Sequence, residues 1–123
     1  MIDHVSVAVR DLAAATRFYE AVLGTIGMRK RDDRRATVGF GKTYPEFWIN
    51  RRDAAGTSDG AHVCFRARTT DMVDAFHAAA LANGGADDGK PGLRPQHGDG
   101  YYAAFVRDLD GNRIEAVTFI GKS

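Results

Sequence analysis

Residues 4–10 read HVSVAVR, and residues 62–68 read HVCFRAR. In both runs apolar side chains alternate with other residues, a period of two that predicts a β-strand with one face on a core. Each run begins with a histidine, His4 or His62, on the face opposite the apolar one. The two histidines are 62 − 4 = 58 residues apart. The two runs therefore indicate an internal repeat.

The same spacing of 58 residues relates other parts of the two halves. A shift of 58 residues aligns identical residues of the two halves: Phe18 with Phe76, Ala21 with Ala79, Leu23 with Leu81 and Gly27 with Gly85. The spacing is kept in a strand, in a helix and in the turn after it, so we interpret the chain as two copies of one folding unit.

Each predicted strand is followed by an apolar pattern of helical period. The first helix is expected over residues 12–23, with Asp11 as its N-cap and Gly24 ending it in the left-handed conformation. The second is expected over residues 71–83, with Thr70 as its N-cap. A glycine pair, Gly84 and Gly85, stops it, and His77 on this helix is expected to be solvated.

The remaining periodic segments predict strands, and the order β-α-β-β-β then occurs twice. This predicts an α+β fold, with two βαβββ modules in one chain that form curved sheets around a cleft. The modules are expected at 1–51 and 60–123, with 52–59 as connector, in a single domain 1–123. The expected strands are 1–10, 26–31, 35–41, 46–50, 62–67, 85–88, 101–107 and 113–120, with turns at 32–33 and 108–112 and a loop at 89–100.

Composition excludes several classes of protein. A net charge of +1 gives no basic footprint for nucleic acid. No apolar run approaches the roughly 20 residues that span a bilayer, and no signal peptide is recognised at the start. A single cysteine cannot form an internal disulfide, so we expect a reducing, cytoplasmic location.

The last predicted strand carries the candidate chemistry. Its alternation places Glu115 on the cleft face together with His4 and His62. Two imidazoles and one carboxylate suit a divalent metal and leave coordination positions open. Taken singly, a strand histidine is more often structural, and Glu115 beside Arg113 is more often part of a cross-strand ion pair. The repeat favours the metal, because equivalent strands bring the two histidines together.

The sequence resembles the vicinal-oxygen-chelate superfamily, which includes glyoxalase I, bleomycin-resistance proteins, fosfomycin-modifying enzymes and extradiol dioxygenases. The resemblance rests on segments from both halves: HVSVAVRD at 4–11, ATRFYEAVLG at 15–24, GAHV at 60–63 and FVRDLDGNRIE at 105–115. It implies paired βαβββ modules and a divalent metal held by the first and last strands of each module.

By position, the resemblance implies that His4, His62 and Glu115 are metal ligands. Zinc, nickel, manganese, iron and cobalt are not distinguished by these residues. Glyoxalase I supplies a fourth ligand, a glutamate, from the last strand of its first module, where either Glu46 or Trp48 takes that position here. Extradiol dioxygenases need a further histidine in the first module, and none lies between His4 and His62.

The resemblance implies a metal-dependent lyase or isomerase of the glyoxalase type that acts on a small, oxygen-rich substrate, including a thiol conjugate. The alternatives are a metal-free protein that binds a drug or metabolite, and a thiol transferase that resembles the fosfomycin enzymes. Glu46, Glu115 and His97 are the candidates to move a proton. A solvent-exposed loop position is the competing interpretation of His97.

Five residues are candidates to bind substrate: Trp48, Arg66, Tyr101, Tyr102 and Arg113. The two arginines can hold an anionic group, and successive tyrosines point to opposite faces, so only one lines the cleft.

Two further expectations concern the single cysteine and the partners. Cys64 is expected to be a small buried filler. The expected partners are a small-molecule substrate, glutathione or another thiol, and a second copy of the chain. Members of the superfamily often dimerise, and whether each cleft forms within one chain or between two is left open by the sequence.

Overall fold

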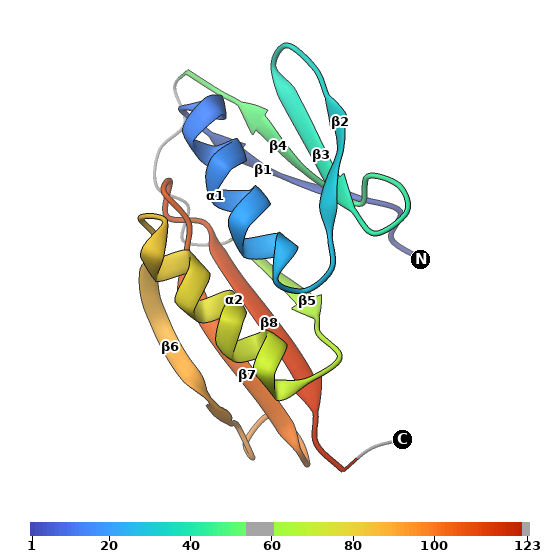
Figure 1. The fold of residues 1–123 in the computed structure, drawn as a ribbon, viewed down its shortest axis with the longest axis vertical. Helices are drawn as coiled ribbons and strands as arrows, with labels where there is room; N and C mark the ends of the chain where they lie inside the picture. The colour runs from blue at the N-terminus through green and yellow to red at the C-terminus, as the bar shows by residue number, and fades with distance from the viewer. Residues whose placement is uncertain (54–60, 122–123) are drawn as a thin grey trace.

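A computed structural model describes residues 1–53 and 61–121, so most of the predicted connector lies outside the described residues. Figure 1 shows the first half of the chain above the second half, and each half has one helix and four strands. The elements are β1 (Val5–Val9), α1 (Leu12–Gly24), β2 (Arg29–Asp33), β3 (Thr37–Gly41), β4 (Phe47–Arg51), β5 (His62–Arg66), α2 (Thr70–Ala82), β6 (Ala86–Leu93), β7 (Tyr101–Arg107) and β8 (Arg113–Phe119).

The strands form two separate four-stranded sheets with the same topology. Their orders are β1-β4-β3-β2 and β5-β8-β7-β6. In each sheet the first strand runs parallel to the last one, and the other neighbours are antiparallel. The predicted fold class, a duplicated βαβββ unit, is therefore confirmed. In the described part of the chain, neither helix has the length and apolarity needed to cross a membrane.

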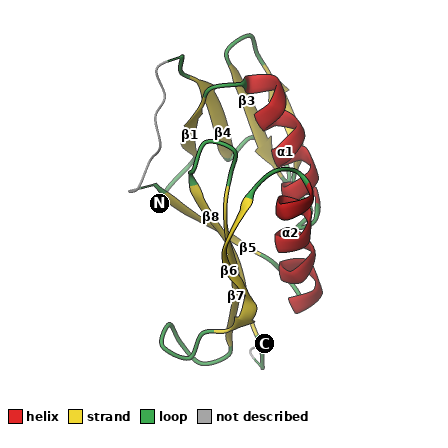
Figure 2. Ribbon diagram, turned by 90° about the vertical axis from the view of Figure 1, so that its left-hand side faces the viewer, coloured by secondary structure: helices red, strands yellow, loops and turns green. Residues whose placement is uncertain are grey.

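Both helices lie on one side of the sheets, and no helix of residues 1–53 and 61–121 lies on the opposite side (Figure 2). We call this second side the open face. Period-two alternation sorts the strands between the two sides: Val7 and Val9 are buried under α1, whereas Ser6 is exposed. The helical pattern of α1 is confirmed in the same way, because Phe18, Tyr19 and Val22 are all buried.

Aromatic rings join the cores of the two halves. The ring of Tyr19 on α1 lies 5.0 Å from that of Phe47 on β4, and Phe47 in turn lies 5.2 Å from Phe65 on β5. Phe65 continues the contact to Phe76 on α2. Aromatic contacts of this kind stabilise the core beyond the apolar area they bury. The two halves therefore share one hydrophobic core.

The turn between β7 and β8 fixes the second half against the first. Asp108 is buried, and its carboxylate accepts a hydrogen bond of 2.6 Å from the Tyr19 hydroxyl of α1. The Asn112 side-chain amide donates both to Asp108, at 2.9 Å, and to the carbonyl of Ala8 on β1, at 3.0 Å. These contacts join residues near the start of the chain to residues near its end. They also give the buried Asp108 carboxylate the hydrogen-bond donors that it needs.

The helix ends differ from the prediction by a few residues. Asp11 caps α1 as predicted, by accepting from the Ala14 N–H. The left-handed residue is Gly27, with φ +88°, rather than Gly24, because a further turn carries the chain on until Met28 donates to a helix carbonyl. For α2 the N-cap is Thr69, not the predicted Thr70, because the Thr69 hydroxyl accepts from the Met72 N–H.

Two strand predictions are also corrected. The hairpin of the first half turns at residues 34–36 rather than at Asp32 and Asp33, which lie in β2. Strand β6 continues into the first part of the predicted loop 89–100, as far as Leu93, because two bulges let glycines stay paired with β7. Pro91 is tolerated because β6 is an edge strand and the proline falls within a bulge.

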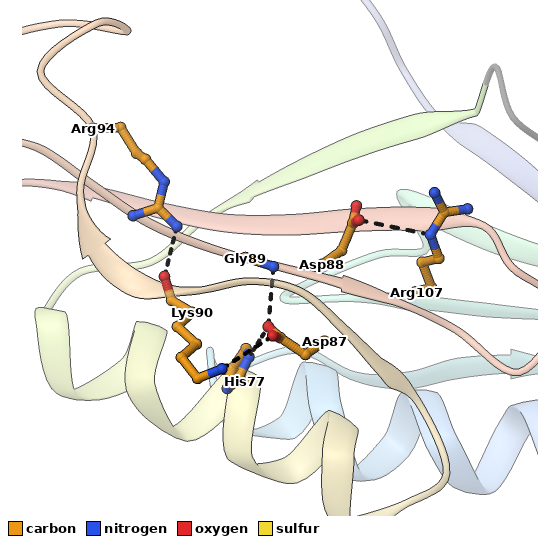
Figure 3. Close-up of polar contacts among 7 residues, drawn as sticks. All are labelled: His77, Asp87, Asp88, Gly89, Lys90, Arg94 and Arg107. Carbon is orange, nitrogen blue, oxygen red and sulfur yellow. Dashed lines mark hydrogen bonds and ion pairs between the residues drawn. The ribbon is translucent and has the colours of Figure 1, made fainter.

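His77 is buried, which corrects the prediction that it is solvated. Only 8% of the residue is exposed, and its Nε2 lies 2.8 Å from an oxygen of Asp87 on β6 (Figure 3). The Gly89 N–H donates to the same carboxylate oxygen, and Lys90 lies 3.4 Å from the other. The hydrogen bond from His77, supported by Gly89, lowers the pKa of Asp87 to about 2. His77 therefore ties the edge strand to α2.

We expect Tyr19→Phe to lower the free energy of unfolding by about 1.5–3 kcal/mol, because the buried Asp108 carboxylate loses a donor. Urea unfolding followed by circular dichroism measures this change. Tyr44→Phe is the matched control, since the exposed Tyr44 hydroxyl bonds only to exposed Asp3. Its effect should stay within about 0.5 kcal/mol. Equal effects of the two variants would contradict a special role for the turn.

The lowered pKa of Asp87 predicts a pH dependence of stability. The folded pKa of about 2 lies below the ordinary value of 3.8, so the contribution of Asp87 is present above pH 4 and is lost as pH falls toward 2. The difference in melting temperature between wild type and Asp87→Asn should therefore shrink across this range. Asp99→Asn, at an exposed position, should show a constant difference.

Candidate functional site

The open face of the second sheet carries the strongest cluster of polar side chains. Cys64 on β5 pairs in register with Glu115 on β8, and alternation brings His62 to the same face. Tyr101 reaches the cluster from β7, the next strand of the sheet. The parallel pairing of β5 and β8 is therefore what places a histidine from the repeat beside the carboxylate of the last strand.

Glu115 is the centre of the cluster and is almost completely buried, with 2% exposed. One of its carboxylate oxygens lies 2.7 Å from His62 Nε2, and the other accepts a hydrogen bond of 2.5 Å from the Tyr101 hydroxyl. His62 itself is half exposed, so the imidazole lies between the buried carboxylate and solvent. Burial, together with the Glu115 hydrogen bond and charge, raises the pKa of Tyr101. The tyrosine therefore stays a neutral donor.

His4 occupies the equivalent place in the first half, just before β1. Its Nδ1 lies 2.8 Å from an oxygen of Asp3, and the Tyr44 hydroxyl donates to the other oxygen of that carboxylate at 3.1 Å. These two contacts lower the pKa of Asp3. A carboxylate at Nδ1 orients an imidazole and directs its Nε2 outward, the arrangement common for metal-binding histidines. Sequence reasoning missed Asp3 and Tyr44, because no periodic pattern links a turn tyrosine to the chain start.

A pocket of about 480 Å³ lies at the seam between the two halves, along the edge strands β1 and β5. Both His4 and His62 line it. Within residues 1–53 and 61–121, however, no three His, Cys, Asp or Glu side chains come close enough to hold one metal ion. The structure thus joins His62 to Glu115 but does not add His4 in the same chain, and the ligand set stays a prediction.

The two residues that compete for the fourth-ligand position lie in different surroundings, and only Glu46 could supply a ligand, because an indole cannot. Glu46 precedes β4 and lines the seam pocket. Trp48 lies within β4 and lines a second pocket of about 470 Å³, which His4 also borders. The Arg34 guanidinium lies over the Trp48 ring at 5.0 Å. Each residue therefore shares a pocket with His4, Glu46 the seam pocket and Trp48 the second one.

The arginine and tyrosine candidates separate into two groups. Arg66 is on the open face, with its guanidinium 4.6 Å from the Phe119 ring centre. Arg113 lies 3.9 Å from Asp88 rather than beside Glu115. Tyr102 points to the helix side, where its hydroxyl donates to Asp74 of α2 at 2.6 Å. The two tyrosines thus point to opposite faces, and Tyr102 lies on the helix side, away from the cluster around Glu115.

His97 and Cys64 flank the cluster. His97 is exposed, between β6 and β7, with its ring 5.3 Å from that of Tyr101. Cys64 is exposed on the open face, which corrects its prediction as a buried filler. Desolvation by its neighbours, with a smaller contribution from the Glu115 charge, raises the pKa of the thiol to about 12. Cys64 is therefore a protonated thiol, not a nucleophile, at neutral pH.

Comparisons with known proteins place this geometry in a family. The family model of the Glyoxalase/Bleomycin resistance protein/Dioxygenase superfamily matches residues 1–116. A glyoxalase/bleomycin resistance protein from Albidiferax ferrireducens T118 is 34% identical, with a TM-score of 0.83 over 94% of this chain and 95% of that one. A search of curated proteins finds no match.

Two more distant solved structures share the fold. The fosfomycin resistance protein FosX from Listeria monocytogenes is 17% identical, with a TM-score of 0.71 over 95% of this chain and 91% of that one. The lactoylglutathione lyase from Agrobacterium tumefaciens is 22% identical, with a TM-score of 0.66 over 95% of this chain and 92% of that one. Identities this low establish the shared architecture alone.

The raised pKa of Cys64 predicts that its thiol reacts slowly with alkylating agents. At pH 8 the thiolate should be about a thousandfold scarcer in the folded protein than in the unfolded chain, because the pKa rises from 9.0 to about 12. Alkylation of the single cysteine by iodoacetamide in EDTA should therefore be at least about a hundredfold slower before urea unfolding than after it. Glu115→Gln should accelerate alkylation of the folded protein, because it removes the negative charge beside the thiol. A folded rate equal to the unfolded rate would contradict this environment.

Proposed function

Because this chain belongs to the Glyoxalase/Bleomycin resistance protein/Dioxygenase superfamily, we propose that it is a divalent-metal-dependent lyase or isomerase of the glyoxalase type that acts on a small, oxygen-rich substrate. The observation that supports this proposal most strongly is the buried Glu115 carboxylate. It is held between His62 and Tyr101 on a face that no helix covers. A buried carboxylate in hydrogen-bonding contact with a half-exposed imidazole is typical of a functional site.

The donor set fits a divalent metal. His62 and Glu115 already lie within hydrogen-bonding distance, so one ion could replace the proton that they share. Tyr101 holds the second carboxylate oxygen, the type of outer contact that orients metal ligands. His4 has its Nδ1 engaged by Asp3, which leaves Nε2 to act as a ligand. Imidazole and carboxylate donors suit zinc, nickel, manganese, iron and cobalt.

We propose that the third ligand, His4, comes from a second copy of the chain. In one chain His4 and the His62–Glu115 pair belong to separate sheets and do not converge on one point. The open faces carry no helix, so a second copy can pack against them (Figure 2). A twofold dimer would then form two equivalent sites, each with His4 from one chain and His62 and Glu115 from the other.

A bound divalent ion would act as a Lewis acid that stabilises negative charge forming on a substrate oxygen. The residues of this chain would supply the rest of the chemistry. Glu46, at the seam pocket, would accept a proton from the substrate, and Tyr101 would keep Glu115 oriented. His97 is exposed beside Tyr101 and would be a second candidate to take up or release a proton.

A metal-free binding protein is the second candidate function. Two observations favour it: the seam pocket has an apolar floor that includes Val5, Met28 and Phe47, and an aromatic wall is present at Trp48 in the neighbouring pocket. Thiol transfer is a third candidate, and glutathione consumption that depends on an added epoxide would identify it. The metal content of the purified protein separates the first two.

We expect protein purified without chelator to contain about one divalent ion per chain. His62→Ala, Glu115→Gln and His4→Ala should each lower this content at least about tenfold, because each removes a ligand or its charge. Elemental analysis measures the content. Asp99→Asn, at an exposed position, is the control. Wild-type protein without metal, and with an unchanged melting temperature when Ni²⁺, Mn²⁺ or Zn²⁺ is added, would favour the binding protein.

Mixing two inactive variants tests the two-chain site. A dimer of one His4→Ala chain and one His62→Ala chain would contain one complete site and one site that lacks both histidines. Co-refolding the two variants should therefore restore metal to about a quarter of wild-type content, since half the dimers are mixed. Refolding either variant alone should restore none. No restoration in the mixture, with metal present in wild type, would place the whole site within one chain.

A further inference from the structure

The open face of the second sheet carries four arginines, and three of them are engaged. Arg107 and Arg113 share the carboxylate of Asp88, at 3.7 and 3.9 Å. Arg94 donates to the backbone carbonyl of Lys90 at 2.6 Å, and its guanidinium lies over a phenylalanine ring. Figure 3 shows the Asp88–Arg107 and Lys90–Arg94 contacts at two points along β6. These arginines therefore serve mainly to hold the bulged edge strand.

Arg66 is the exception. Across residues 1–53 and 61–121, none of the ion pairs of the structure involves it. Its guanidinium lies 4.6 Å from the centre of the Phe119 ring, and that ring is in edge contact with Tyr101. A cation–π contact positions a guanidinium and leaves its N–H groups available for an oxyanion. Arg66 is thus a fixed cation that lacks a carboxylate partner.

Arg66 lines the same seam pocket as His4 and His62. Two carboxylates, Asp3 and Glu46, also line this pocket, but Asp3 is already paired with His4, and Lys42 lines the pocket together with Glu46. The floor is apolar, and a volume of about 480 Å³ is within the range of small-molecule sites. A complementary ligand therefore combines a compact apolar body with one anionic group.

We propose that Arg66 binds an anionic group of the substrate, so that the site selects organic acids, carboxylates above all, over neutral compounds. The proposal rests on the proposed function, because Arg66 lies on the same strand and face as His62 and therefore assigns a substrate class to the site that His62 and Glu115 form. The structure also distinguishes Arg66 from Arg113, which the sequence alone presents as equal candidates to bind an anionic group. Arg113 is neutralised by Asp88, whereas the Arg66 guanidinium remains available for a bidentate contact with a planar carboxylate.

The test uses small probes and protein kept in EDTA, so that binding does not depend on a metal. Phenylacetate and its neutral isostere phenylacetamide are titrated against the full chain and followed by calorimetry. We expect phenylacetate to bind at least about tenfold more tightly than the amide, and Arg66→Gln to remove this preference. Arg66→Lys should keep part of it, because the charge remains and the planar fork is lost.

Arg113→Gln is the matched control and should change phenylacetate affinity less than about twofold, since that guanidinium already faces Asp88. Circular dichroism and melting temperature establish that each variant is folded. Equal binding of the acid and the amide, no binding of either, or equal losses in Arg66→Gln and Arg113→Gln would overturn the proposal. Metal content is measured separately: acid selectivity in a metal-free protein would leave the Arg66 assignment intact and remove the metal-dependent function.

Discussion

The structure depends on one buried carboxylate, that of Asp108. A carboxylate out of contact with water is costly unless donors surround it, and this one receives them from Tyr19 and from the turn that contains it. The turn makes a second anchor where Asp110 accepts from the backbone N–H of Arg10 at 3.0 Å. Both contacts cross from the second half of the chain to the first. Satisfying the charge of Asp108 therefore requires the two halves to be docked.

This docking has a direct consequence for the site. The turn leads directly into β8, which carries Glu115. Asn112 of the same turn donates to the carbonyl of Ala8 near the end of β1, so one contact positions both strands. Strands β1 and β5 are consequently held as two edges that face each other across the seam, each with its histidine at the start. The apolar core joins the halves on the helix side, whereas none of the described helices covers the open face.

The sequence predicts the parts of this arrangement that depend on local pattern. Alternation around His4 and His62, and the helical spacing of Phe18 and Tyr19, lead to the correct elements and the correct faces. Helix boundaries are less certain because Thr69 and Thr70 can each act as a cap. Bulges break the period-two signal, so a strand rich in glycine and proline is mistaken for a loop.

What the sequence does not predict are contacts between elements that only tertiary packing brings together. The burial of His77 depends on Asp87, which belongs to an edge strand whose register is set by its bulges. The separation of His4 from Glu115 depends on how two sheets dock, and no periodicity encodes that distance. Family resemblance supplies the expectation of a shared site, and the geometry shows which of its members a single chain assembles.

The two buried helix side chains, Tyr19 and His77, occupy the same position of the duplicated unit, since 77 − 19 = 58. The tyrosine reaches outward to a carboxylate of the other half, whereas the histidine reaches a carboxylate of its own half. The two copies have thus diverged: the helix of the first half makes a contact between the halves, and the helix of the second half makes one within its own half. A protein made by fusing two first halves would contain two tyrosines equivalent to Tyr19 and no equivalent of the Asp108 turn to accept their hydrogen bonds. The two halves are therefore not interchangeable.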